Sequence, residues 1–133
     1  MIIVVTGANG QLGTDVVLVA KNQGYDVYGL SRNELDITSI EQVKITINEI
    51  KPDVIIHCAA YTNVDLAETE IERAFQVNAN GSRNIAIAAE EVGAKVCYIS
   101  TDYVFEGTSQ KPYQEYDNTN PLSIYGKSKL VGE

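Results

Sequence analysis

The chain has 133 residues, of which 44% are hydrophobic and 21% are charged, values close to those of an average globular domain. This composition excludes a disordered chain, which would be poor in apolar residues, and no apolar run reaches the roughly 18 residues that a membrane-spanning helix needs. Ten Lys and Arg against eighteen Asp and Glu give a net charge of −8, which argues against general nucleic-acid binding because such a protein repels phosphate backbones.

Short, nearly continuous apolar runs predict strands that are buried on both faces. These runs are residues 2–5, 25–30, 54–59 and 96–100, and residues 35–37 could add a short edge strand. The first run is too short, and lacks the basic start, to be a secretory signal, so we expect a cytoplasmic protein. Cys58 and Cys97 lie inside apolar runs, which predicts two buried free thiols. Two cysteines and the single His57 do not suffice for a metal site, so none is predicted.

Helical stretches separate the strands, over residues 12–22, 39–50 and 71–92. Thr38 and Glu41 have the spacing of a capping box at the start of the second helix. Strands that alternate with helices predict an α/β fold, a doubly wound Rossmann-type parallel sheet with helices on both faces and right-handed crossovers. Residues 101–121 are rich in turn formers and exceed the usual loop length, which indicates a functional or flexible loop. Its tyrosines either pack the loop down or form the wall of a pocket.

Residues 6–13 (TGANGQLG) place three glycines at G-x-x-G-x-x-G spacing, directly after the first strand and at the start of the first helix. Gly7 would permit a tight turn, Gly10 would let the backbone approach a pyrophosphate, and Gly13 would let the helix pack close to the sheet. The helix N-terminus would offer free N–H groups to the phosphates. The motif predicts a dinucleotide-binding turn, the alternative being a glycine-rich turn without a ligand. The predicted contacts are Gly7, Asn9, Gly10, Gln11, Leu12 and Gly13.

The remaining cofactor contacts are expected where later strands end. The second strand ends at Leu30, without the acidic residue that would bind the ribose hydroxyls of NAD. Arg32 follows instead and could bind the additional phosphate of NADP, so NADPH is the expected cofactor and NADH remains open; a solvated surface arginine is the alternative. Asp36 and Ile37 would meet the adenine ring. Small residues and their neighbours after the third strand would approach the cofactor closely: Ala59, Ala60, Tyr61 and Thr62.

Tyr125 and Lys129 are four residues apart and would share one face of a helix. An ammonium group near a phenol favours the phenolate and so suits proton transfer, and the same lysine could bind a cofactor ribose. A hydroxyl at Ser100 or Thr101, after the fourth strand, could bind the carbonyl or carbinol oxygen of a substrate. The alternative for the Tyr125 and Lys129 pair is an ordinary amphipathic helix surface.

Together these segments resemble the extended short-chain dehydrogenase/reductase superfamily and, within it, the dTDP-4-dehydrorhamnose reductase family. The resemblance covers essentially the whole chain. It is carried by residues 6–13, 52–65 (PDVIIHCAAYTNVD), 68–78 (ETEIERAFQVN), 99–105 (ISTDYVF) and 121–133 (PLSIYGKSKLVGE). The glycine motif is shared widely, whereas the STDYVF and YGKSKLVGE segments are specific.

The resemblance implies NAD(P)H-dependent reduction of the 4-keto group of dTDP-4-dehydrorhamnose, which gives dTDP-L-rhamnose. It implies a catalytic group of Thr101, Tyr125 and Lys129, and substrate contacts at Ser100, Thr101, Asp102 and Tyr103. A nucleotide-sugar epimerase or dehydratase, or a non-catalytic regulatory subunit, is the alternative. Members of the family carry a second, smaller domain for the nucleotide sugar. We therefore expect residues 1–133 to be an NAD(P)-binding domain that is inactive without that part and could form a homodimer.

Overall fold

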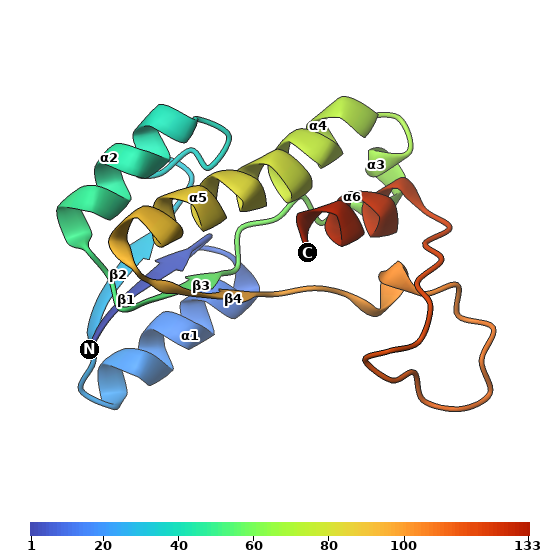
Figure 1. Cartoon of the computed structure of the whole chain (residues 1–133), viewed down its shortest axis with the longest axis horizontal. Coiled ribbons are helices and arrows are strands. Elements are labelled where there is room, and N and C mark those ends of the chain that lie inside the picture. Colours follow the sequence, from blue (N-terminus) through green and yellow to red (C-terminus); the bar gives the residue numbers. More distant parts are fainter.

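The fold is built on a sheet of four parallel strands with the order β2-β1-β3-β4. The computed structural model describes residues 1–133, and its strands are β1 (Ile2–Thr6), β2 (Asp26–Leu30), β3 (Val54–His57) and β4 (Lys95–Tyr98). Helices cover both faces of the sheet (Figure 1). The predicted doubly wound, Rossmann-type α/β fold is confirmed.

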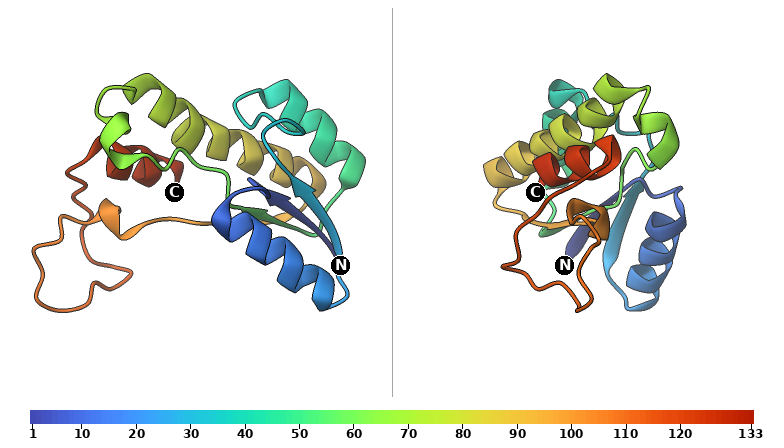
Figure 2. Two further views of the ribbon diagram at one scale, coloured as in Figure 1. Left: turned by 180° about the vertical axis from the view of Figure 1, so that it is seen from behind. Right: turned by 90° about the vertical axis from the view of Figure 1, so that its right-hand side faces the viewer.

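Three long helices form the two outer layers: α1 (Gln11–Asn22), α2 (Ile40–Ile50) and α5 (Ser82–Val92). Helix α1 packs on one face of the sheet, whereas α2 and α5 lie together on the other (Figures 1 and 2). Shorter elements are α3 (Val64–Ala67), α4 (Ile71–Phe75), the π-helix η1 (Gln76–Gly81), the 3-10 helix η2 (Asp102–Val104) and α6 (Ile124–Gly132). None of the helices is long and apolar enough to cross a membrane.

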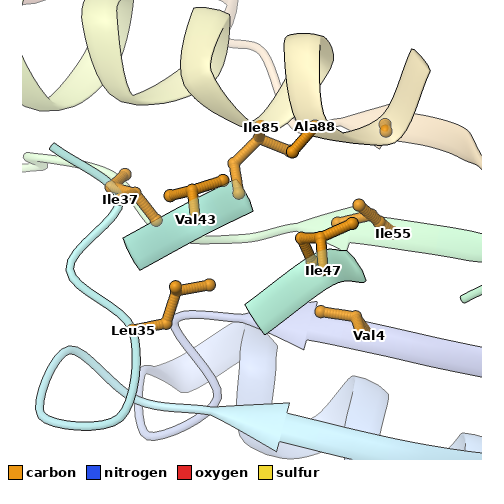
Figure 3. Packing of buried hydrophobic residues seen from close by; sticks show 9 residues of the cluster. Val4, Leu35, Ile37, Val43, Ile47, Ile55, Ile85 and Ala88 are labelled. Carbon is orange, nitrogen blue, oxygen red and sulfur yellow. The ribbon is translucent and has the colours of Figure 1, made fainter. Parts of the chain in front are cut away.

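The core is explained by the two-residue period of the strands. Val4 points to the α2 and α5 side, where it joins the larger cluster of buried residues with Ile47 and Ile85 (Figure 3). Ile3 and Val5 point to the opposite side and pack with α1. A strand that is covered on both faces is expected to be apolar on both, and β1 has that pattern from Ile2 to Val5.

The segment between β2 and α2 departs from the prediction, because residues 35–37 are not a strand. Leu35 and Ile37 are apolar because both side chains are buried in the larger core cluster. The predicted capping box is also wrong. Ser39 caps α2 by accepting a hydrogen bond from the Gln42 N–H (3.4 Å), while the Thr38 hydroxyl donates to Asp36 Oδ1 (2.7 Å).

The fourth strand is more exposed than its apolar sequence predicts. It lies at the edge of the sheet, and α1 packs against β1 and β2. Val96 is therefore 39% exposed and Cys97 is exposed, whereas Cys58 is half-buried. Two buried free thiols were expected, so for Cys97 the prediction is wrong.

The predicted helix over residues 71–92 exists as one continuous helical run of α4, η1 and α5, with a π-helical middle. The long loop after β4 extends away from the sheet before the chain returns as α6 (Figures 1 and 2). Within it, the rings of Phe105 and Tyr113 stack at a centroid distance of 4.3 Å, while Tyr116 is 81% exposed. Tyr113 thus packs one part of the loop against another, whereas Tyr116 is exposed to solvent.

Candidate functional site

A cavity of about 650 Å³ opens at the carboxyl ends of the strands. Its lining comes from the segments after all four strands, from the start of α1, from the helical run of α4 and η1, and from α6. Sixteen of the residues singled out from the sequence line it: Gly7, Asn9, Gly10, Gln11, Leu12, Gly13, Arg32, Asp36, Ile37, Ala59, Ala60, Tyr61, Thr62, Ser100, Tyr125 and Lys129. Segments far apart in the sequence therefore meet in one site.

The glycine turn packs closely against neighbouring backbone at Gly7 and Gly13, and it leaves space at Gly10. Gly7 has φ 65°, and a Cβ atom there would lie 2.8 Å from the Cα atom of Ala59. A Cβ at Gly13 would lie 2.9 Å from the Cα atom of Ala8. At Gly10, by contrast, a Cβ would meet only the Gly7 carbonyl oxygen, at 3.3 Å. The turn can thus admit a ligand against its backbone at Gly10.

The start of α1 has the properties of a phosphate site. No side chain caps this helix, and its first turn has no acidic residue. The first N–H groups of a helix lack partners within the helix and carry its positive dipole end. Together with the open backbone at Gly10, they fit a pyrophosphate.

The end of the cavity next to β2 holds Arg32, Asp36 and Ile37. The Asp36 carboxylate accepts hydrogen bonds from the Thr38 hydroxyl (2.7 Å) and the Thr38 N–H (3.0 Å). These two bonds, with a smaller contribution from the charge of Arg32, hold the pKa of Asp36 below its ordinary value. Asp36 is therefore a fixed acceptor beside an apolar side chain, as the predicted adenine contact requires.

The turn after β3 is held in place by Asn78 in η1. The Tyr61 N–H donates to Asn78 Oδ1 (2.8 Å), and Asn78 Nδ2 donates to the Tyr61 carbonyl (3.0 Å). Asn78 Nδ2 also donates to Ser128 Oγ in α6 (2.9 Å), and Ser128 donates to the Tyr125 carbonyl (2.8 Å). This one buried side chain thus joins the β3 turn to the helix that carries Tyr125.

A buried histidine lies beneath the site. His57 Nδ1 is 2.7 Å from Thr6 Oγ1, and Nε2 is 3.2 Å from Ser82 Oγ. Ser82 donates its own proton to the Asn78 carbonyl, so it must accept from His57 Nε2–H, which leaves Nδ1 as the acceptor. Burial, and to a lesser degree the charge of Lys129, lowers the pKa of His57 to about 4. His57 is therefore a neutral structural group and not a proton donor at neutral pH.

Helix α6 brings Tyr125 and Lys129 to the cavity. Its first turn is capped by Ser123, whose hydroxyl accepts from the Gly126 N–H (3.0 Å). Lys129 is only 3% exposed; its Nζ donates to the Ile99 carbonyl (2.6 Å) and lies 4.1 Å from the ring centroid of Tyr98. Burial lowers the pKa of Lys129 to about 8, against the opposite effect of the Glu133 carboxylate.

Thr101, Asp102 and Tyr103 lie outside the cavity lining, unlike Ser100. Thr101 caps η2, where its hydroxyl oxygen accepts from the Tyr103 N–H (3.3 Å). The Tyr103 ring packs edge-on against Tyr125, with a centroid distance of 5.6 Å. The turn into η2 thus separates these three residues from Ser100, and Tyr103 supports the site from outside.

Sequence reasoning missed several residues of the site. Asn78 lay inside a predicted helix, where a buried polar side chain gives no signal without knowledge of its partners. Arg73, in the same helical run, also lines the cavity. The other residues of the lining that were not predicted are Asp15, Leu35, Thr38, Cys58, Val77 and Ile99.

Comparison with known proteins places this site in a family. The chain is 45% identical over 132 residues to dTDP-4-dehydrorhamnose reductase of Aggregatibacter actinomycetemcomitans, covering 98% of the chain and 45% of that protein. It matches the crystal structure of dTDP-4-dehydrorhamnose reductase from Bacillus anthracis in complex with NADP with a TM-score of 0.96 and 50% identity, over 98% of the chain and 47% of that structure. UDP-glucose 4-epimerase of Thermus thermophilus, at 24% identity and TM-score 0.92, covering 99% of the chain and 48% of that structure, shares the fold.

The chain spans about half the length of the curated relatives that it matches. The family model described as "RmlD substrate binding domain" matches residues 1–133. The chain therefore belongs to the RmlD substrate binding domain family.

Proposed function

We propose that residues 1–133 are the NADPH-binding part of a reductase that acts on the 4-keto group of a dTDP-4-dehydro-6-deoxy sugar, with dTDP-L-rhamnose as the product. One observation carries this proposal: the glycine turn, Arg32, Tyr125 and Lys129 line the same cavity. The relatives named dTDP-4-dehydrorhamnose reductase, and the one solved with NADP, support the substrate and the cofactor.

The residues that would hold the dinucleotide follow from their places along the sheet edge. The N–H groups at the start of α1 face the pyrophosphate, Arg32 binds the 2′-phosphate, and Asp36 with Ile37 receives the adenine. The turn after β3, held by Asn78, borders the nicotinamide. When bound, the cofactor supplies a hydride.

The proton for the reduced carbonyl oxygen comes from Tyr125. Lys129, whose pKa is lowered to about 8, remains largely cationic at neutral pH, and its charge stabilises the phenolate that is left behind. Ser100 is the cavity hydroxyl after β4, and we expect it to orient the substrate oxygen in place of its hydrogen bond to the Glu133 carboxylate. The catalytic role of Thr101 stays a prediction, because its hydroxyl caps η2.

The first test is a fluorescence titration of this chain with NADPH and with NADH. Saturable binding is expected, and absence of binding to both by a chain that circular dichroism shows to be folded would contradict the proposed site. The second test follows NADPH absorbance in the full-length protein with the dTDP-4-keto sugar. Stoichiometric oxidation of NADPH indicates reduction, whereas product formation without net NADPH consumption indicates epimerisation.

A further inference from the structure

Arg73 is a cation of the cavity to which the proposed function gives no role. It lies on α4, in the helix layer opposite α1 (Figure 1), yet it lines the same cavity as the glycine turn. Of the charged residues in the lining, Asp15 and Asp36 are acidic, and the Lys129 amino group is bonded to the Ile99 carbonyl. Arg32 and Arg73 are the two remaining cations of the lining, and Arg73 also forms an ion pair with Glu70.

The guanidinium of Arg73 is positioned by two neighbours. Arg73 Nη1 donates to Glu70 Oε2 (3.2 Å), and the same oxygen accepts from the Tyr61 hydroxyl (2.9 Å). The guanidinium carbon also lies 5.8 Å from the ring centroid of Tyr61. One of its five N–H donors is thus engaged, and the side chain is 52% exposed. The other donors remain available to an anion in the cavity.

The strand order indicates which anionic group of a bound dinucleotide would lie near Arg73. Along the sheet edge, Arg32 follows β2, the glycine turn follows the central β1, and Tyr61 follows β3. Arg32 and Arg73 therefore stand on opposite sides of the glycine turn. If a dinucleotide places its 2′-phosphate at Arg32 and its pyrophosphate at the turn, the pyrophosphate is the nearer of its two anionic groups to Tyr61 and Arg73. A protein of net charge −8 needs such local cations to hold polyanions.

We propose that Arg73 binds the pyrophosphate of the dinucleotide from the helix layer opposite the glycine turn. The proposal rests on the proposed function and assigns a specific ligand group to Arg73. Planar N–H pairs of arginine match phosphate oxygens. Since the pyrophosphate is common to both cofactors, Arg73 contributes equally to NADPH and NADH binding, in contrast to Arg32.

The test measures Kd for NADPH and NADH with Arg73→Gln, Arg73→Lys, Arg32→Gln and the control Arg83→Gln, whose side chain is exposed on α5 outside the cavity. Arg73→Gln is expected to raise both Kd values about tenfold, with a smaller rise for Arg73→Lys. Arg32→Gln should raise the NADPH value selectively, and Arg83→Gln should change neither. An Arg73→Gln variant that binds both cofactors like the wild type, or loses only NADPH affinity, overturns the proposal.

The Glu70→Gln variant distinguishes direct binding of the cofactor by Arg73 from an indirect effect of Arg73 through Glu70 and Tyr61. It removes the carboxylate charge that pairs with Arg73 and leaves the guanidinium in place. Affinity equal to or tighter than that of the wild type supports a direct contact. A loss equal to that of Arg73→Gln would mean that Arg73 acts through Glu70 and Tyr61, and overturns the proposal. If the wild-type chain binds neither cofactor, the failure lies in the proposed function itself.

Discussion

Asn78 and Tyr61 exchange two hydrogen bonds, in which the side-chain amide of Asn78 pairs with both backbone groups of Tyr61. The amide thereby satisfies both backbone polar groups of Tyr61, which lies beyond the end of β3 and pairs with no strand. Its second N–H bonds Ser128 in α6. Asn78, which is 1% exposed, therefore links α6 directly to the turn after β3.

Replacing Asn78 with Ala should destabilise the protein by about 3 kcal/mol, because the buried partners in Tyr61 and Ser128 lose their hydrogen bonds. The free energy of unfolding from urea titration measures this. Asn80→Ala is the matched control, since Asn80 is exposed in the same π-helix and should change stability by less than about 0.5 kcal/mol. Equal effects of the two variants would contradict the role of Asn78 as a buried link.

The glycine turn gives a second prediction, since Gly7 combines a positive φ with close packing against Ala59. Gly7→Ala should cost more stability than Gly107→Ala, because Gly107 has a similar φ of 77° but nothing within 4 Å of its would-be Cβ. The strain of the left-handed backbone, about 1 kcal/mol, is common to both variants. The additional loss at Gly7, measured by thermal or urea unfolding, reports the close approach. Identical losses would show that backbone conformation alone requires glycine at position 7.

His57 predicts a dependence of stability on pH. Its pKa is about 4 in the folded protein against 6.5 ordinarily, so the unfolded chain binds more protons between these values. The free energy of unfolding must therefore fall as pH falls from 6.5 to 4, by up to about 3 kcal/mol from this group. The carboxylates also titrate in this range, so the comparison is between the wild type and His57→Gln across the same pH series. The variant should lose this part of the pH dependence; parallel curves for the two proteins would contradict the burial of a neutral imidazole.

Much of the cavity could be predicted from sequence because strand ends in a parallel sheet share one edge. Arg32, Tyr61 and the glycine turn each follow a strand, and the structure brings them together. Asn78 and Arg73 come from a helical run, and the residues that they contact depend on how that run crosses the sheet. A pattern of helical residues does not contain this information, because a π-helical segment changes which side chains face the site.

Two other differences between the sequence-based expectations and the structure have local causes. Thr101 is adjacent to Ser100, but the chain turns into η2 at this point, so Ser100 lines the cavity and Thr101 does not. The apolar sequence of β4 predicts burial on both faces, yet a strand at the edge of a sheet has one neighbouring strand. Hydrophobicity indicates that a segment forms a strand and does not indicate its place in the sheet order.

Tyr125 provides the prediction that separates chemistry from binding. Tyr125→Phe in the full-length protein should reduce kcat by about 10² to 10⁴, since it removes the hydroxyl that supplies the proton. The ring and its edge-on contact with Tyr103 remain, so the Kd for NADPH should change little. Tyr113→Phe is the matched control, because Tyr113 stacks on Phe105 in the long loop and is not part of the cavity lining; it should keep full turnover. If Tyr125→Phe keeps the wild-type kcat, the proton has another source and α6 serves to hold the cofactor only.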